Sequence, residues 1–336
     1  MKIKENFSLL PHNTFGLNIK TDFFIEFNSV EELQMVLQSD IVKSNRVLCI
    51  GGGSNLLFLS DFKGVVLHSN IQSVTIIKED ADSVFLEVGS GVNWDDLVAH
   101  TVENGWGGIE NLSLIPGETG ASALQNIGAY GVEVQDVIEK VKAVNISTGK
   151  VHDFSHDECR YGYRSSTFKN EMKGAYSITS VILKLSKKPV FKLNYPHLEE
   201  EVLKTGEISL TNIRKTIITI RESKLPDPKI LGNAGSFFIN PVISKQHFEA
   251  LQTQFPEIPH YFVSETQEKV PAAWLIEQCG WKGKQIGNAG VHDKQALVLV
   301  NLCGATGSEI VHLAEQIQLS VQVKFGVELI PEVNYI

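Results

Sequence analysis

Residues 105–131, GWGGIENLSLIPGETGASALQNIGAYG, hold glycines, small residues and side-chain amides at a density too high for an ordinary core helix or strand. Glycine allows the backbone to approach another group closely and to adopt conformations that other residues avoid. Loops of such composition carry binding functions on a scaffold of regular elements. We therefore expect the backbone of this stretch to lie against a ligand.

This is the second glycine-rich stretch of the chain; the first, GGGSN at 51–55, directly follows the apolar run 47–50, which reads as a buried strand. Its amides can converge on an anion, and Ser54 and Asn55 add side-chain donors. A Walker loop would need GK[ST] here, and GxGxxG fails because position 56 is leucine. Alone, GGGSN is also compatible with a plain tight turn. Together, two such loops about 60 residues apart can hold one extended dinucleotide from two sides.

The rest of the chain predicts an α+β fold without a regular βαβ repeat. Capping and apolar periodicity predict helices at 31–37, 93–105, 211–221, 244–255, 271–279 and 307–325. Apolar runs predict strands at 84–88, 137–147, 176–185 and 327–336. The segment 159–164, CRYGYR, alternates aromatic and basic residues as if one set of side chains shared a face. The composition changes near residue 211, where we expect a domain boundary.

Composition and charge narrow the functional classes. The 336 residues carry a formal net charge of −9, which gives no general attraction for nucleic acid. The four cysteines lack zinc-site spacing, and His152, His156 and His292 lack partners at metal-binding spacing, so we expect no metal. No apolar stretch approaches the roughly 20 residues of a membrane span. We expect a cytoplasmic protein without a membrane or nucleic-acid partner.

Seven ordered motifs spread over nearly the whole chain carry a resemblance to a known family. They lie at 51–55, 115–117, 125–131, 163–164, 225–229, 232–238 and 329–332, within a match that runs from 13 to 333. On these motifs the sequence resembles UDP-N-acetylenolpyruvoylglucosamine reductases, which act in bacterial peptidoglycan precursor synthesis.

The resemblance implies an FAD-binding part of the vanillyl-alcohol-oxidase (PCMH) type, made of two subdomains, plus a C-terminal α+β substrate-binding domain. The expected limits are 1–67 for subdomain 1, with the C-terminal strand 326–336 returning to it, 68–213 for subdomain 2, and 214–325 for the substrate domain. No histidine occupies the glycine turn, where Gly53 is followed by Ser54 and Asn55, so the FAD is expected to be non-covalent, with NADPH as hydride donor. The implied FAD-binding residues are Gly51, Gly52, Gly53, Ser54, Asn55, Pro116, Gly117, Gly120, Gln125, Asn126, Gly128 and Arg221.

The family's catalytic residues match Arg164, Ser236 and Glu332. Hydride delivery to an enolpyruvyl ether places negative charge on the neighbouring carbon and the carboxylate, and a fixed guanidinium at Arg164 would stabilise it. Ser236 would supply the proton and Glu332 would polarise the carboxylate. The alternatives are a surface arginine, a turn serine and a solvent-facing glutamate. The protonation state of Glu332 cannot be read from the sequence.

The implied substrate contacts are Tyr163, Tyr195, Lys224, Asn240, Tyr261 and Gln295. Tyr195, in KLNYP at 192–196, is expected in a loop that closes over the substrate pyrophosphate. Its alternative is a half-buried tyrosine before a helix that starts at Pro196.

The expected activity is NADPH-dependent reduction of UDP-N-acetylglucosamine enolpyruvate to UDP-N-acetylmuramate, by a monomer with a small-molecule substrate as its partner. One alternative is an FAD-linked oxidase of the same superfamily acting on an alcohol or sugar, which would need a base rather than a proton donor. A flavin-free nucleotide-binding module is another alternative, and a colourless protein that gains no flavin on reconstitution would support it.

Overall fold

The computed structural model describes residues 2–336, which divide into two compact units. Unit 1 consists of the chain up to Phe7, Lys20–Gly53 and Phe62–Ser223, and unit 2 of Ser8–Ile19, Ser54–Asp61 and Lys224–Ile336. The polypeptide thus contributes three separate segments to each unit. The two units are described separately below.

Unit 1 contains a four-stranded sheet in the order β1 (Ile3–Ser8), β2 (Lys20–Phe27), β5 (Phe62–Ser69), β3 (Val47–Ile50). Strands β2 and β3 both run parallel to β5. Helices α1 (Val30–Gln38) and α2 (Asp40–Lys43) follow β2, and Ser29 caps α1 by accepting from the Glu32 N–H at 3.1 Å. Leu33 and Val36 of α1 share a core with Ile25 and Val65 of the sheet. This core fixes β3, whose end precedes the first glycine-rich stretch.

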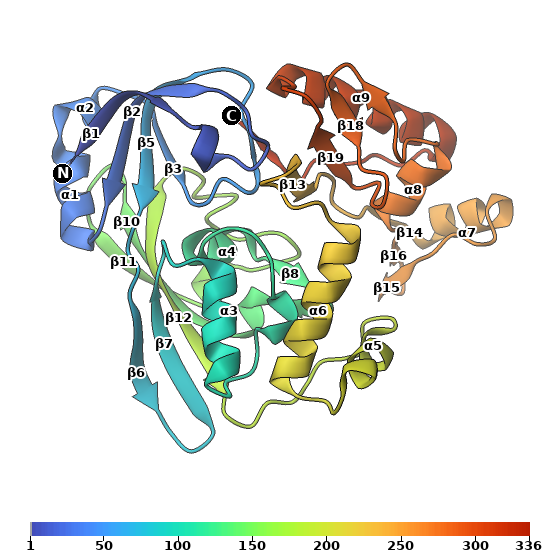
Figure 1. The fold of residues 1–336 in the computed structure, drawn as a ribbon, viewed down its shortest axis with the longest axis horizontal. Helices are drawn as coiled ribbons and strands as arrows, with labels where there is room; N and C mark the ends of the chain where they lie inside the picture. Colours follow the sequence, from blue (N-terminus) through green and yellow to red (C-terminus); the bar gives the residue numbers. More distant parts are fainter. Residues whose placement is uncertain (1) are drawn as a thin grey trace. The chain divides into compact units, whose positions relative to one another are not determined.

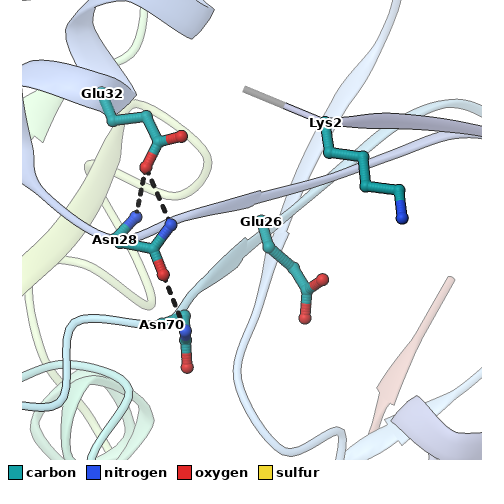
Figure 2. Close-up of a pocket in the computed structure, with 5 residues that line it drawn as sticks. All are labelled: Lys2, Glu26, Asn28, Glu32 and Asn70. Atoms are coloured by element: carbon teal, nitrogen blue, oxygen red, sulfur yellow. Dashed lines mark hydrogen bonds between the residues drawn. The ribbon is translucent and has the colours of Figure 1, made fainter.

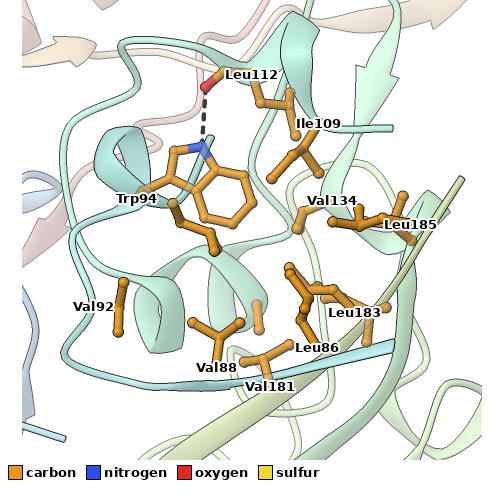
Figure 3. Packing of buried hydrophobic residues seen from close by; sticks show 14 of the residues in the cluster. Leu86, Val88, Val92, Trp94, Ile109, Leu112, Val134, Val181, Leu183 and Leu185 are labelled. Carbon is orange, nitrogen blue, oxygen red and sulfur yellow. Dashed lines mark hydrogen bonds between the residues drawn. The ribbon is translucent and has the colours of Figure 1, made fainter. Parts of the chain in front are cut away.

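The second sheet of unit 1 is antiparallel, in the order β11 (Val151–Ser155), β10 (Ile138–Asn145), β12 (Tyr176–Ser186), β7 (Ser83–Gly89), β6 (Val74–Glu79). Helix α3 (Trp94–Glu103) is capped by Asn93, and α4 (Thr119–Gln125) lies against β12 and β7 (Figure 1). Trp94 is buried in the core and its Nε1 donates to the Leu112 carbonyl at 3.0 Å (Figure 3). The core thereby anchors α4 and the loop before it.

Unit 1 closes with short elements and two helices. Strands β8 (Gly128–Ala129) and β9 (Val132–Glu133) form a small hairpin, with 3-10 turns η2 (Glu110–Leu112), η3 (Val134–Asp136) and η4 (Asp157–Cys159) around it in the chain. Helix α5 (Leu198–Thr205) begins two residues after the expected start at Pro196. Helix α6 (Leu210–Lys224) reaches the end of the unit.

The shared face expected for one set of side chains at 159–164 is wrong. Arg160 and Arg164 have left-handed backbone, with φ of 45° and 54°, and an isolated bridge joins Gly162 to Ser165. The segment is therefore a tight turn, and its two tyrosines do not share a face, because Tyr161 packs against the core whereas Tyr163 is exposed.

Unit 2 contains two small sheets. One has the order β13 (Gly232–Ser236), β19 (Val298–Asn301), β18 (Ala289–Val291), β17 (Gln285–Ile286), and the other β14 (Val242–Ser244), β16 (Gln267–Lys269), β15 (Tyr261–Ser264). Helices α7 (Lys245–Gln254), α8 (Ala272–Gln278) and α9 (Gly307–Phe325) accompany them, and η1 (Leu10–His12) lies in an early segment. The capping box of Thr306 and Glu309 begins α9, and Gly326 in left-handed conformation ends it.

The strand expected at 327–336 is mostly wrong. Only β20 (Asn334–Tyr335) is a strand, and it pairs in parallel with β4 (Leu56–Leu57) of the same unit. Val327, Leu329 and Val333 are buried, so the apolar pattern reflects packing rather than a continuous ladder. Among residues 2–336, no helix has the length and apolar character needed to cross a membrane. The same residues contain no group of three or more metal-binding side chains.

Candidate active site

The two glycine-rich stretches lie against each other in unit 1. A Cβ atom on Gly52 would meet the Gly117 Cα at 3.2 Å, and one on Gly51 would meet Glu118 Oε2 at 3.2 Å and the Ala121 Cβ at 3.3 Å. Gly53 turns the chain with φ of 65°. Side chains at Gly51 and Gly52 would crowd these neighbours, so the glycines favour the close approach of the two loops.

The start of α4 is held against the β7–α3 connection. The Gly120 N–H donates to the Ser90 carbonyl at 2.9 Å, and a Cβ on Gly120 would meet the Ser90 Cβ at 2.7 Å. Gly117 has φ of 122° and its carbonyl accepts from the Trp94 N–H at 3.1 Å, next to the exposed Pro116. The predicted flavin residues 116, 117 and 120 therefore form one fixed loop, while Gln125 ends the helix.

Asn126 organises the turn that follows α4. Its backbone is left-handed, with φ of 49°, and its buried side chain donates to Glu133 Oε2 at 2.9 Å and to the Gly162 carbonyl at 2.8 Å. Its Oδ1 accepts from the Gln135 N–H at 3.1 Å. These bonds join the 126–135 region to the turn that carries Arg164.

The Arg164 guanidinium is held by backbone carbonyls and a carboxylate. It donates to the Asn126 carbonyl at 3.3 Å and to the Gly128 carbonyl, and lies 3.5 Å from Glu133 Oε1. Its Cζ lies 5.1 Å from the ring centre of the exposed Tyr163. Of the predicted residues, Asn126, Gly128, Tyr163 and Arg164 are thus brought together.

Helix α6 contributes a second partly buried cation, Arg221, to unit 1. The Arg221 Nε is buried without a hydrogen-bond partner among the described residues. Burial lowers the pKa of Arg221, and the nearby Tyr130 and Asp95 oppose that shift. Tyr130 has a left-handed backbone and its ring meets Tyr195 edge-on, with centroids 5.1 Å apart. The predicted lid tyrosine therefore rests on a residue of the second glycine-rich stretch.

Unit 2 brings Ser236, Glu332 and Asn55 together. Exposed Ser236 ends β13 opposite Val298, after Gly235 with φ of 68°. The Glu332 N–H donates to the Phe237 carbonyl at 2.8 Å, and Asn55 Nδ2 donates to the Glu332 carbonyl at 3.1 Å. The C-terminal segment is thus tied both to the strand that carries the serine and to the residue that follows the glycine turn.

The other predicted substrate residues have separate local roles. Asn240 Oδ1 accepts from the Ala272 N–H at 2.9 Å at the start of α8, and the Gln295 carbonyl accepts from the Val298 N–H at 3.0 Å. The Tyr261 ring lies under Lys269 Nζ at 5.8 Å. Lys224 is exposed at the end of α6. Nothing in these contacts by itself identifies a sugar-nucleotide site.

Two side chains beside the glycine turn, His68 and Glu118, were not predicted from the sequence. They lie 50 positions apart, yet His68 Nε2 and Glu118 Oε1 are 2.9 Å apart. The only signal was the position of Glu118 inside the second glycine-rich stretch.

A polar hollow of about 340 Å³ in unit 1 is lined by Lys2, Glu26, Asn28, Glu32 and Asn70 (Figure 2). None of these residues belongs to the predicted site. The hollow nevertheless reaches Glu26, whose carboxylate lies 3.7 Å from His68 Nδ1.

Comparisons with known proteins agree with this arrangement. An FAD binding domain family matches residues 21–155, and the C-terminal domain family of UDP-N-acetylenolpyruvoylglucosamine reductase matches residues 227–336. The protein of Bacteroides fragilis named UDP-N-acetylenolpyruvoylglucosamine reductase is 49% identical over 334 residues, covering 99% of this chain and 100% of that protein. The Porphyromonas gingivalis protein of the same name is 49% identical over 338 residues, covering 100% of both.

Among solved structures, the crystal structure of UDP-N-acetylenolpyruvylglucosamine reductase from Thermus caldophilus matches with a TM-score of 0.69 and 22% identity, over 100% of this chain and 99% of that one. This likeness shows that the fold is shared. The fold is an FAD-binding part of the PCMH type followed by the family's C-terminal domain, as expected from the sequence. With about half of all positions identical over the full length, the chain belongs to the UDP-N-acetylenolpyruvoylglucosamine reductase family.

Proposed function

We propose that this protein reduces UDP-N-acetylglucosamine enolpyruvate to UDP-N-acetylmuramate in peptidoglycan precursor synthesis, with NADPH as reductant and FAD as cofactor. Family membership over the full length supports the reaction. The observation that carries it is the backbone bond from the Glu332 N–H to the Phe237 carbonyl, which holds the segment that contains Glu332 next to the strand that ends at Ser236, the residue expected to protonate the substrate.

The residues of unit 1 fit an FAD pyrophosphate. The 51–53 turn lies so close to Gly117 and Glu118 that a Cβ at Gly51 or Gly52 would crowd them at 3.2 Å, and glycines at these positions keep the backbone amides of the turn accessible to an anion. The Arg221 Nε is buried without a partner and can donate to an anion. FAD would be held non-covalently by the twelve residues assigned above from residues 51 to 221. When bound, it supplies hydride transfer between NADPH and the substrate.

Arg164 stabilises the negative charge that reduction places on the enolpyruvyl group. Its guanidinium is held by two carbonyls and by Glu133, so its donors are oriented before substrate arrives. A preoriented cation does not have to reorganise during the reaction, which is the basis of electrostatic catalysis. Lysine could not reproduce this geometry, because it has no planar fork.

Ser236 donates the proton to the carbanion-like carbon, and Glu332 hydrogen-bonds the substrate carboxylate. The left-handed Gly235 turns the chain so that Ser236 is exposed, while its neighbours Phe237 and Phe238 are buried. A serine is a weak acid, but an enediolate is a strong base, so a positioned hydroxyl suffices.

Substrate binding falls to Tyr163, Tyr195, Lys224, Asn240, Tyr261 and Gln295, with Tyr195 on a loop that closes over the pyrophosphate. The edge-on contact of Tyr195 with Tyr130 supports this, because it gives the loop a resting position inside unit 1.

The proposed functional domains are FAD-binding subdomain 1 at 1–67 with 326–336, FAD-binding subdomain 2 at 68–213, and the substrate-binding domain at 214–325. The cysteines at 49, 159, 279 and 303 are free thiols, which supports a reducing cytoplasm, and we propose a monomer.

An absorbance spectrum followed by an anaerobic NADPH titration tests the function. Purified protein should be yellow, should release its flavin on denaturation, and should bleach with NADPH. Adding the enolpyruvyl sugar nucleotide should restore the oxidised spectrum. Flavin that stays with the denatured chain would contradict non-covalent binding, and reduced flavin that reacts with oxygen but not with this substrate would contradict the reaction.

A further inference from the structure

Three parallel strands of unit 1 place a row of residues side by side at the end that leads into the glycine turn. In the register of the sheet, Glu26 of β2 pairs with His68 of β5, and His68 pairs with Ile50 of β3. Ile50 immediately precedes Gly51. In open α/β sheets, ligands bind outside the carboxyl ends of parallel strands. This row therefore lies directly under the turn expected to hold the pyrophosphate.

Charged groups form a connected chain along the row. Lys4 Nζ lies 2.8 Å from Glu26 Oε2, Glu26 Oε1 lies 3.7 Å from His68 Nδ1, and His68 Nε2 lies 2.9 Å from Glu118 Oε1. The His68 and Glu118 side chains are only 13% and 14% exposed. The outer end of the chain, at Glu26, opens on the polar hollow of Figure 2. The inner end reaches the glycine turn.

Glu118 stands at an N-cap position but does not cap its helix. It precedes α4 with extended backbone and makes no side-chain bond to the helix N–H groups. Its carboxylate turns instead toward His68 and Gly51. The second oxygen, Oε2, is buried without a hydrogen-bond partner among the described residues, 3.2 Å from where a Gly51 Cβ would be. A buried carboxylate with so few partners is costly unless a cation neutralises it.

His68 is the group that can neutralise it. Burial disfavours the charged imidazole, but the hydrogen bond and charge of Glu118, together with the charge of Glu26, outweigh burial and raise the pKa of His68. A neutral His68 would leave an uncompensated carboxylate under a turn that must accept a diphosphate. Like charges at such distances repel, most strongly where water is excluded.

We infer that His68 and Glu118 are a positioning pair for the FAD pyrophosphate, bracing the 51–53 turn and favouring the bound cofactor only while His68 carries a proton. The groups that face His68 are Glu118 from the loop before α4 and Glu26 from β2, with Lys4 of β1 behind Glu26. The inference rests on the proposed FAD binding. It assigns a role in cofactor affinity to two residues outside the predicted site.

The test measures the FAD dissociation constant by flavin fluorescence on dilution of the holoprotein, from pH 5.5 to 9. Wild type should bind FAD roughly three- to tenfold more weakly above the His68 inflection than below it. His68→Gln keeps a hydrogen-bond donor but cannot take up a proton. Its affinity for FAD should therefore not vary with pH and should stay near the value that wild type has at high pH. Glu118→Gln should bind more tightly than wild type at high pH.

The decisive variant is His68→Gln/Glu118→Gln, which removes both charges. At every pH, this double variant should bind FAD as tightly as wild type binds it at low pH, because no carboxylate remains under the turn. His152→Gln, an exposed histidine of the antiparallel sheet, serves as the matched control and should behave as wild type. A double variant no tighter than His68→Gln, or a His68→Gln profile that keeps the wild-type inflection, would overturn the inference.

A second measurement needs no variant and covers the case in which one fails to fold. Because cofactor and proton favour each other, FAD binding to the flavin-stripped wild-type chain should take up protons near the inflection. Calorimetry in two buffers of different ionisation enthalpy measures this uptake, and zero uptake would contradict the inference. A protein that binds no FAD at all would instead contradict the proposed function.

Discussion

The backbone N–H of Glu332 donates to the carbonyl oxygen of Phe237 at 2.8 Å, one residue beyond Ser236. The next pair along, Phe238 and Pro331, forms an isolated antiparallel bridge. Backbone bonds thus hold these two segments together independently of the Ser236 and Glu332 side chains. Substitutions of those side chains should therefore report on chemistry rather than on local folding.

Ser236→Ala should separate the two half-reactions. Anaerobic flavin reduction by NADPH should proceed at nearly the wild-type rate, because the hydroxyl has no part in it. Reoxidation by the enolpyruvyl substrate should slow by about 10²- to 10⁴-fold, the usual cost of losing a positioned general acid. Stopped-flow absorbance of the flavin measures both rates. The reoxidation rate of Ser236→Cys should lie between those of the alanine variant and wild type. If the flavin of the alanine variant is reoxidised at the wild-type rate, Ser236 is only a turn residue.

Arg164→Lys should lower kcat for substrate reduction by about 10²-fold or more, because lysine cannot make the bonds to the Asn126 and Gly128 carbonyls with a fork in fixed orientation. Steady-state kinetics with the sugar nucleotide measures the effect. Arg160→Lys, at a neighbouring exposed arginine 3.7 Å from Glu171, is the matched control and should leave kcat unchanged. Equal losses in both variants would point to disruption of the turn.

Tyr195→Phe should raise the KM for the sugar nucleotide by about tenfold, the value of one hydrogen bond to a charged group. The ring contact with Tyr130 should survive, so flavin reduction by NADPH should not change. Tyr195→Ala loses the ring contact as well and should bind still more weakly. Rapid-mixing measurement of each half-reaction distinguishes these outcomes. A parallel loss in the NADPH half-reaction would argue against a lid.

Gly120→Ala should lower flavin occupancy and destabilise unit 1 by about 1–3 kcal/mol, the range for overpacking. The added methyl would meet the Ser90 Cβ at 2.7 Å and would force the start of α4 away from its neighbour. Gly149→Ala is the control, because its φ of 69° strains an alanine but leaves open space around the methyl. It should cost about 1–2 kcal/mol without losing flavin. The ratio of flavin to protein absorbance and chemical unfolding measure the two effects.

The ion pair of Asp95 and Arg214 should contribute stability that acid removes. Two bonds of 2.6 and 2.9 Å join them, and although burial opposes ionisation, Arg214 and the Leu114 N–H hold the pKa of Asp95 below its ordinary value. A lowered carboxyl pKa stabilises the fold above the unfolded value, about 3.9, and the contribution disappears as pH falls through the folded pKa.

Arg214→Met should therefore cost about 1–3 kcal/mol of unfolding free energy near pH 7, and the difference from wild type should shrink below about pH 4. Urea unfolding in saturating FAD at several pH values measures it. Lys215→Met, at the adjacent exposed position, should differ little from wild type at any pH. A difference that stays constant down to pH 3 would assign the loss to packing instead.

Local signals in the sequence predicted six of the helices, α1, α3 and α6 to α9, and four of the strands, β3, β7, β10 and β12. Ser29 caps α1, Asn93 caps α3 and Gly326 ends α9, as their residue types indicated. These features depend on neighbours within one turn of helix, so a single sequence contains them. The strand expected at 327–336 failed for the opposite reason: its hydrogen-bond partners lie at Phe237, Phe238 and 55–57, far along the chain.

The candidate site likewise has parts that the local sequence predicts and parts that depend on residues far apart in the chain. Glycine spacing indicated which backbone segments must approach a ligand, and the close contact of Gly52 with Gly117 confirms that the two stretches meet. The partnership of His68 with Glu118 could not be predicted, because it depends on the register of β5 and on a loop 50 residues away. Neither residue type carries that information by itself.

Because unit 2 is built from three segments of the chain, it limits which fragments can fold and when the unit can fold during translation. β20 pairs with Leu56–Leu57, and Gly307 lies so close to the Phe58 carbonyl that no Cβ would fit there. A fragment that begins at Lys224 would lack both partners and would expose an unpaired strand edge. During translation, the β4–β20 pairing cannot form until Asn334 and Tyr335 have been synthesised, so unit 2 can mature only after the whole of unit 1 has been made.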